Sequence, residues 1–159
     1  MFSKSLKLGL LFAAGTLATI TATASADNIN TSGVLCQNFN AREALDIDYI
    51  SSGVRNLAAA PRLVICAMPR SPLAATPFRT FYVDGQNNAG TATSCTITVY
   101  SYQGIIQSTQ SFTESAGPAP WDHGVTMPVV PGTFDYASLL CSLPANAGGT
   151  LFGVTAIQP

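Results

Sequence analysis

The chain has 159 residues, of which only 9% are charged, and its seven basic and eight acidic side chains give a formal net charge of −1. A chain of this length forms one domain around a single core. A few scattered arginines in a slightly acidic chain make no basic surface, so the composition excludes nucleic acid and anionic membranes as partners.

The first 26 residues have the order of a secretory signal peptide. Lys4 and Lys7 supply a positive start, residues 8–14 form a short apolar run, and Ala24-Ser-Ala26 is a small-x-small cleavage site. That run is too short to cross a bilayer, and no later segment reaches the roughly 18–20 apolar residues that a membrane helix needs. We therefore expect residues 27–159 to form one secreted or periplasmic domain without a membrane span.

Four cysteines in an exported chain predict two disulfides. Neither a redox pair nor a zinc site is expected, because the chain has no Cys-x-x-Cys motif and only one histidine. Spacing alone does not choose among the three possible pairings. We favour the pairing that closes loops of a few tens of residues, which joins Cys36 to Cys66 and Cys95 to Cys141.

Short segments with the composition of β-strands follow one another along the chain, separated by turn residues. Residues 27–32 are polar and are expected to be a loose leader, and residues 41–47 suit one helical turn. Residues 117–120 are expected to be a loop. The expected strands are residues 48–57 with a possible bulge at Gly53, 62–67, 78–84, 95–102, 105–112, 125–130, 133–140 and 150–157.

The clearest strand is residues 95–102, in which apolar and polar residues alternate strictly. Cys95, Ile97 and Val99 are expected to face the core, with the intervening threonines and tyrosines on the other side. No long segment has apolar residues at helical spacing. The pattern therefore predicts an all-β fold, an antiparallel β-sandwich that is immunoglobulin-like or jelly-roll-like.

Several short motifs together resemble a loose group of small secreted bacterial β-proteins with two disulfides and no assigned function. They are Gly53-Val-Arg-Asn56, residues 63–70, Cys95-Thr-Ile-Thr-Val-Tyr100 and residues 136–144, which end Cys-Ser-Leu-Pro. Ala67 stands where the group's pattern usually has proline. The resemblance supports the β-fold and the favoured disulfide pairing, and it implies no catalytic residue.

Exposed aromatic rings are the best candidates for ligand contact. Tyr100 and Tyr102 lie on the polar side of their expected strand, Tyr82 is placed similarly on residues 78–84, and Trp121 falls in an expected loop. Aromatic rings on a sheet can stack on sugar rings, although tyrosine also suits strands that bind nothing.

Groups for catalysis or metal binding are sparse. His123 is flanked by Asp122, which is poorly placed to orient its ring in a Ser–His–Asp site, and the chain has no Gly-x-Ser-x-Gly motif. Asp46 and Asp48 are weak calcium candidates. Asp46 and Asp48 together, or either of them with Asp84 or Glu114, could form the carboxylate pair of a glycoside hydrolase.

The expectation is therefore an exported protein without enzymatic activity or cofactor, which binds a glycan or another exported protein. One alternative is a structural subunit of the envelope or extracellular matrix that self-associates through an exposed edge strand. A small hydrolase using Asp and Glu is a third possibility.

Overall fold

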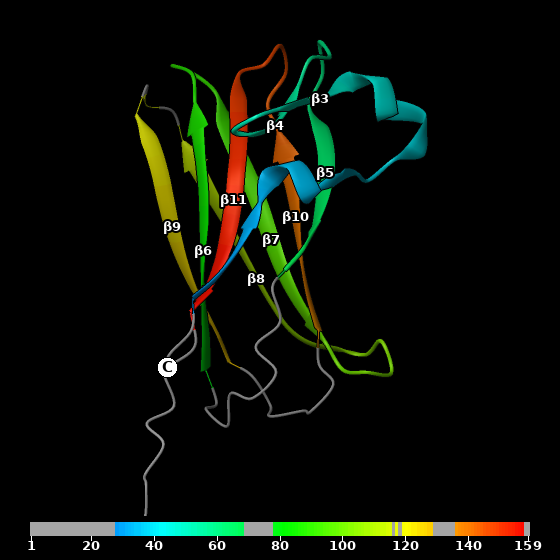
Figure 1. Ribbon diagram of the computed structural model, residues 1–159, viewed down its shortest axis with the longest axis vertical. Helices are drawn as coiled ribbons and strands as arrows, with labels where there is room; N and C mark the ends of the chain where they lie inside the picture. Colours follow the sequence, from blue (N-terminus) through cyan, green and yellow to red (C-terminus); the bar gives the residue numbers. More distant parts are fainter. Residues whose placement is uncertain (1–27, 69–77, 116, 118, 129–135, 158–159) are drawn as a thin grey trace, which may run out of the picture.

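The computed structural model describes residues 28–68, 78–115, 117, 119–128 and 136–157, which form two antiparallel sheets packed face to face (Figure 1). The signal peptide expected over residues 1–26 lies outside the described residues. The described helices are two short 3-10 turns, so none of them could cross a membrane. The elements are β1 (Asn28–Ser32), η1 (Gly33–Leu35), β2 (Gln37–Asn38), η2 (Ala41–Asp46), β3 (Ile47–Ile50), β4 (Gly53–Asn56), β5 (Arg62–Ala67), β6 (Phe78–Asn87), β7 (Ala92–Tyr100), β8 (Ile106–Ser115), β9 (Pro120–Pro128), β10 (Tyr136–Leu143) and β11 (Gly149–Ile157).

The strand order is that of a jelly roll. Sheet A has the order β3-β4-β11-β6-β9, with β1 also paired to β11, and sheet B has the order β2-β5-β10-β7-β8. From β4 to β11 the chain contributes four strands to each sheet, and it crosses between the sheets at most connections, as in a double-sheet jelly roll. The expected antiparallel β-sandwich is confirmed, in the second of the two forms that the sequence left open.

The core fills the space between the inner faces of the two sheets. In β7, Cys95, Ile97 and Val99 are at most 2% exposed, so the expected alternation is confirmed. In β6, Phe81 and Val83 face the core in the same way. Met127 of β9 and Leu151 of β11 complete this layer from sheet A.

Both disulfides have the favoured pairing. Cys95 lies directly opposite Cys141 in the register of β7 and β10, and Cys36 is bonded to Cys66 of β5. All four residues are at most 2% exposed. The first bridge links neighbouring strands of sheet B, and the second fastens the segment between η1 and β2 to the same sheet.

Residues 48–57 do not form the single expected strand. They contribute to a hairpin in which β3 pairs with β4, with Ser51 and Ser52 in the turn. Gly53 begins β4 because β11 passes very close to it. A Cβ at this position would lie 2.1 Å from the carbonyl oxygen of Leu151. The glycine marks a close approach between strands and not a bulge.

One segment expected to be irregular is a strand, and one expected loop is shorter than predicted. The polar leader forms β1, which pairs with β11 from Asn28 opposite Ile157 to Ser32 opposite Gly153. The expected loop ends earlier than predicted, because β9 starts at Pro120 and pairs with β6. Both strands have a polar outer face, so apolar periodicity gave little signal for them.

Candidate functional site

A β-bulge in β11 shapes the outer face of sheet A. Leu151 pairs with Gly85 and Gly153 pairs with Asp84, so Phe152 is an extra residue in the ladder. Bulges of this kind redirect side chains and are frequent beside functional sites. Here the bulge puts Phe152 beside Asp84, while Gly153 supplies a position without a side chain.

A groove opens at this bulge, between β1, β11 and β6. Its volume is about 450 Å³, within the usual range for small-ligand sites. Gly153 lies close beneath β1, because a Cβ there would be 2.6 Å from the carbonyl oxygen of Thr31. The polar and aromatic side chains that line the groove are those of Asn30, Thr31, Ser32, Asp84, Phe152 and Thr155.

The acidic part of this site is a carboxyl pair. Asp84 of β6 lies directly opposite Asp122 of β9, and their side chains are hydrogen-bonded to each other. Burial raises the pKa of the Asp84 carboxyl, and the negative charge and hydrogen bond of Asp122 raise it further. The Asp84 carboxyl is therefore protonated more readily than an ordinary aspartate. The oxygens of the exposed Asp122 can accept hydrogen bonds from a ligand.

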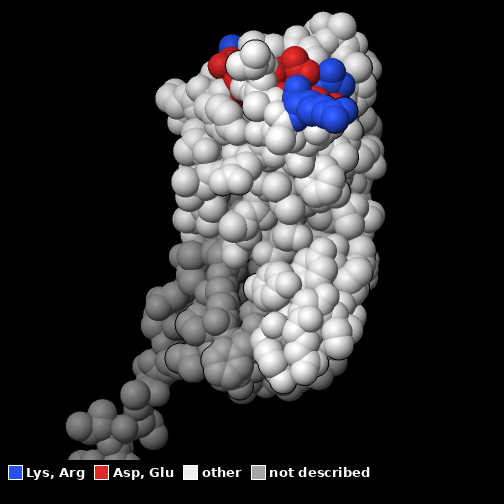
Figure 2. All heavy atoms as spheres, turned by 90° about the vertical axis from the view of Figure 1, so that its right-hand side faces the viewer, with Lys and Arg blue, Asp and Glu red and all other residues white. Residues whose placement is uncertain are grey.

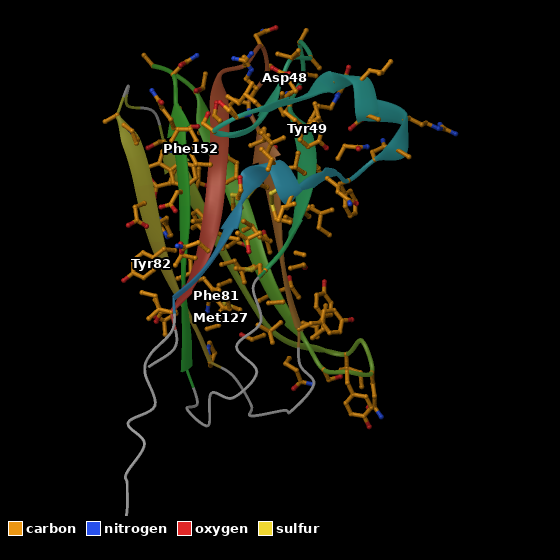
Figure 3. The ribbon with its side chains drawn as sticks, in the orientation of Figure 1. Asp48, Tyr49, Phe81, Tyr82, Met127 and Phe152 are labelled. Atoms are coloured by element: carbon orange, nitrogen blue, oxygen red, sulfur yellow. A yellow bond between two sulfur atoms is a disulfide. The ribbon has the colours of Figure 1, made fainter. Side chains whose placement is uncertain are left out.

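Tyr82 provides an aromatic surface next to the groove. Its neighbours in β6, Phe81 and Val83, are buried, so Tyr82 points to the outer face of sheet A (Figure 3). Its ring covers Gly124 of β9, where a Cβ would lie 3.2 Å from Cε1 of the tyrosine. The missing side chain at Gly124 lets the ring lie close against the sheet.

Asn30 and Thr155 are the groove's neutral polar groups. They face each other in the register of β1 and β11, and Thr155 pairs with Tyr82 on its other side. The Thr155 hydroxyl donates to Oδ1 of Asn30 over 2.7 Å. This bond fixes the amide and leaves its N–H groups as hydrogen-bond donors for a ligand.

The other tyrosines named from the sequence lie on sheet B and not beside this groove. Tyr100 stacks on Tyr136 of β10, with ring centroids 5.2 Å apart. Tyr102 follows β7 in the turn and is 68% exposed. Next to Tyr136, a smaller hollow of about 330 Å³ has no charged residue among its described lining residues.

Trp121 is not in a loop and does not belong to the outer face. It lies in β9, packs against the core, and its ring occupies the space that a side chain at Gly85 would fill. Its Nε1 is buried and has no hydrogen-bond partner among the described residues. Trp121 is therefore a packing residue of the sandwich.

His123 joins the two sheets at one edge. The ring stacks on Phe112 of β8, with centroids 4.0 Å apart, and Nδ1 is hydrogen-bonded to the Glu114 carboxylate. Asn87 is fully buried and donates to the Glu114 carbonyl oxygen over 3.0 Å. These contacts of His123 are structural. The carboxylate that orients its ring is Glu114 and not Asp122.

Asp46 and Asp48 each bind an arginine. Asp46 accepts from Nε of Arg62 at 2.7 Å, and Asp48 accepts from Nε of Arg55 at 2.8 Å. The charged side chains on this side of the molecule gather at one end, and the other described residues on that surface are uncharged (Figure 2). Within the described ranges no three acidic, histidine or cysteine side chains are grouped to hold a metal ion, so the calcium interpretation of these aspartates gains no support.

Sequence reasoning found Tyr82 and Asp84 but missed the rest of the groove. Phe152 resembled a core residue of a regular strand, and the bulge that turns it outward leaves no signature in the sequence. Asn30 was assigned to a loose leader. The signal that was available is the alternation in β6, which places Tyr82 and Asp84 on one face.

No family model matches the chain, and no curated protein matches it. Among solved structures it is similar to the CBM36-1 domain of a multidomain xylanase from the hindgut metagenome of Trinervitermes trinervoides. That match has a TM-score of 0.52 and 12% identity, and it covers 82% of this chain and 96% of the domain. A CBM36 carbohydrate-binding module in complex with calcium and xylotriose matches with a TM-score of 0.50 and 13% identity, over 80% of this chain and 98% of the module. At these identities the likeness shows a shared β-sandwich fold.

Proposed function

We propose that this protein is an exported, non-catalytic glycan-binding module and that the groove beside the bulge in β11 is its binding site. The observation that carries the proposal is the combination of an aromatic surface at Tyr82 with hydrogen-bonding groups at Asp84, Asp122 and Asn30. Sugars present apolar ring faces bordered by hydroxyls, so they need both kinds of contact. The fold shared with two carbohydrate-binding modules supports the proposal.

The carboxyl geometry favours binding over hydrolysis. Glycoside hydrolases hold their two carboxyl groups about 5–10 Å apart, so that the scissile bond lies between them. Asp84 and Asp122 are hydrogen-bonded to each other, which leaves no room for a sugar between them. The carboxylates of Asp46, Asp48 and Glu114 are each engaged with a basic partner elsewhere.

Calcium, which one of the similar modules binds together with its sugar, fits these residues poorly. The ion takes six to eight oxygen ligands and prefers ionised carboxylates. The groove offers one carboxyl group, that of Asp84, and its raised pKa disfavours the ionised form. We therefore assign the hydrogen bonding to these side chains directly, without a metal.

The test is binding of the oxidised protein to soluble xylan, galactan and β-glucan, followed by calorimetry with oligosaccharides of the polymer that binds. Tyr82→Ala should weaken binding at least about tenfold, because it removes the aromatic surface. Gly124→Val should weaken it as well, because its side chain displaces the Tyr82 ring. Tyr49→Ala is the matched control, since this tyrosine is 47% exposed and lies next to Asp48, away from the groove (Figure 3).

Two results would contradict the proposal. One is a folded protein that binds none of the polysaccharides with or without added calcium. The other is binding that Tyr82→Ala and Tyr49→Ala reduce equally, because the contact would then not involve the groove.

A further inference from the structure

In the described residues, five strands have a partner on one side only, and they differ in how far they are protected against pairing with another chain. Sheets expose unpaired backbone N–H and C=O groups at their edges, and proteins block them with short strands, prolines or charges. At one end of sheet B, β2 has two residues. At the corresponding end of sheet A, β3 has four residues, including Asp48, and β1, which pairs only with β11, has five. At the other end of sheet A, β9 begins and ends with proline and carries Asp122.

The fifth edge strand, β8, lacks these protections. It has ten residues and, in the described part of the chain, pairs only with β7. From Ile106 to Thr113 it contains neither a charged residue nor a proline. The ladder with β7 is irregular only around Gln107, so Ser108–Thr113 is a regular, uncharged edge.

The composition of this edge suits pairing with itself. A two-fold axis places an antiparallel strand against its own copy, so every charge near the centre would meet a like charge. The first charged residue, Glu114, lies near the end of β8 and is already paired with His123. Ser111 and Thr113 are bonded to hydroxyls of β7, which holds their side chains in place on the outer face.

We propose that two copies of this protein associate through β8, which joins their B sheets into one continuous antiparallel sheet. The partner is a second copy of this chain, and the contact is a main-chain ladder along Ser108–Thr113. A two-fold pairing through β8 uses the same edge of both copies, so this contact joins two copies and no more. The groove lies on sheet A, whereas β8 belongs to sheet B, so pairing through β8 leaves both grooves of the dimer open.

Sedimentation velocity of the oxidised protein over about 1 µM to 1 mM tests the proposal. A dimer should appear as the concentration rises, with no larger species. Gln110→Lys should raise the dissociation constant at least about tenfold. Gln110 is exposed but lies opposite the buried Ile97, so a lysine there is an inward-pointing charge of the kind that blocks edge strands.

Gln37→Lys is the control, because it makes the same change at an exposed position of β2, the opposite edge of sheet B, and should leave the dissociation constant unchanged. Amide exchange of the wild type gives an independent readout, in which protection of residues 108–113 should increase with concentration. A monomer across the whole range, equal association of both variants, or an open-ended ladder of oligomers would each overturn the proposal. None of these results depends on whether the groove binds a glycan.

Discussion

Replacing Asn56 with aspartate should be among the most destabilising isosteric changes in this chain. Asn56 ends β4 and is fully buried. Its Nδ2 donates to the carbonyl oxygens of Ala60, Leu143 and Pro144 at 2.8, 3.3 and 3.1 Å, and its Oδ1 accepts from the Ala58 amide at 2.9 Å. The side chain therefore ties sheet A to the end of β10 in sheet B.

Aspartate keeps the shape but turns the donor into an acceptor that faces three carbonyl oxygens. Each buried group left without its partner costs about 1–3 kcal/mol, so we expect Asn56→Asp to lower the free energy of unfolding by about 4 kcal/mol at neutral pH. Burial must raise the pKa of the new carboxyl above its unfolded value. The folded state then binds the extra proton, so the loss should shrink as the pH falls through that raised pKa.

Urea unfolding at pH 7 and pH 4 measures both effects. Asn88→Asp is the matched control, because Asn88 is exposed and donates to the Ala147 carbonyl oxygen over 3.3 Å. The reasoning is refuted if the two variants differ by less than about 0.5 kcal/mol at neutral pH, which is the usual effect of a surface change.

Two further predictions concern the disulfides and the carboxyl pair. Removing one bridge with the double change Cys95→Ala and Cys141→Ala should lower the free energy of unfolding by about 4 kcal/mol, because the bridge joins residues 46 positions apart. Urea unfolding under non-reducing conditions measures this loss. A loss below about 1 kcal/mol would contradict the loop-entropy argument. Because the pKa of Asp84 is raised in the folded protein, its contribution to stability is present below its unfolded pKa and is lost as the pH rises through the folded pKa. Asp84→Asn should remove that loss and raise the free energy of unfolding at neutral pH by less than about 1 kcal/mol, since solvent screens the pair. No gain is expected near pH 3. Thermal unfolding from pH 3 to pH 7 measures the difference, and a gain in acid alone would refute the raised pKa of Asp84.

The parts of the fold that could be predicted are those where burial repeats with the period of a strand. In β7 the core-facing positions Cys95, Ile97 and Val99 alternate with polar residues, and β5 matches its expected range of residues 62–67. The disulfide pairing was one of three that the sequence allowed. The register of β7 and β10, which places Cys95 opposite Cys141, is what identifies the pairing.

The candidate site could not be assembled from the sequence because it depends on contacts between distant strands. Asp84 and Asp122 become partners only through the register of β6 and β9, and Asn30 meets Thr155 only because β1 joins the sheet. The error at residues 48–57 has a similar origin, since the two serines of the tight turn resemble strand residues until β3 and β4 are seen to pair. Trp121 was misplaced because the prolines before it and the charged pair after it suggested a loop.

The pairing of β1 with β11 also fixes how this domain can be attached to anything else. Asn28 lies opposite Ile157, so the first and last described strands meet at one end of the sandwich, away from the end that carries η2 and β3 (Figure 1). A carrier domain, a label or a solid support joined directly before β1 or directly after β11 would therefore approach from the same side. Because the start of β1 and the end of β11 are neighbours, a short linker between them could join these two strands. New termini could then be opened in the exposed turn at Ala89–Gly90.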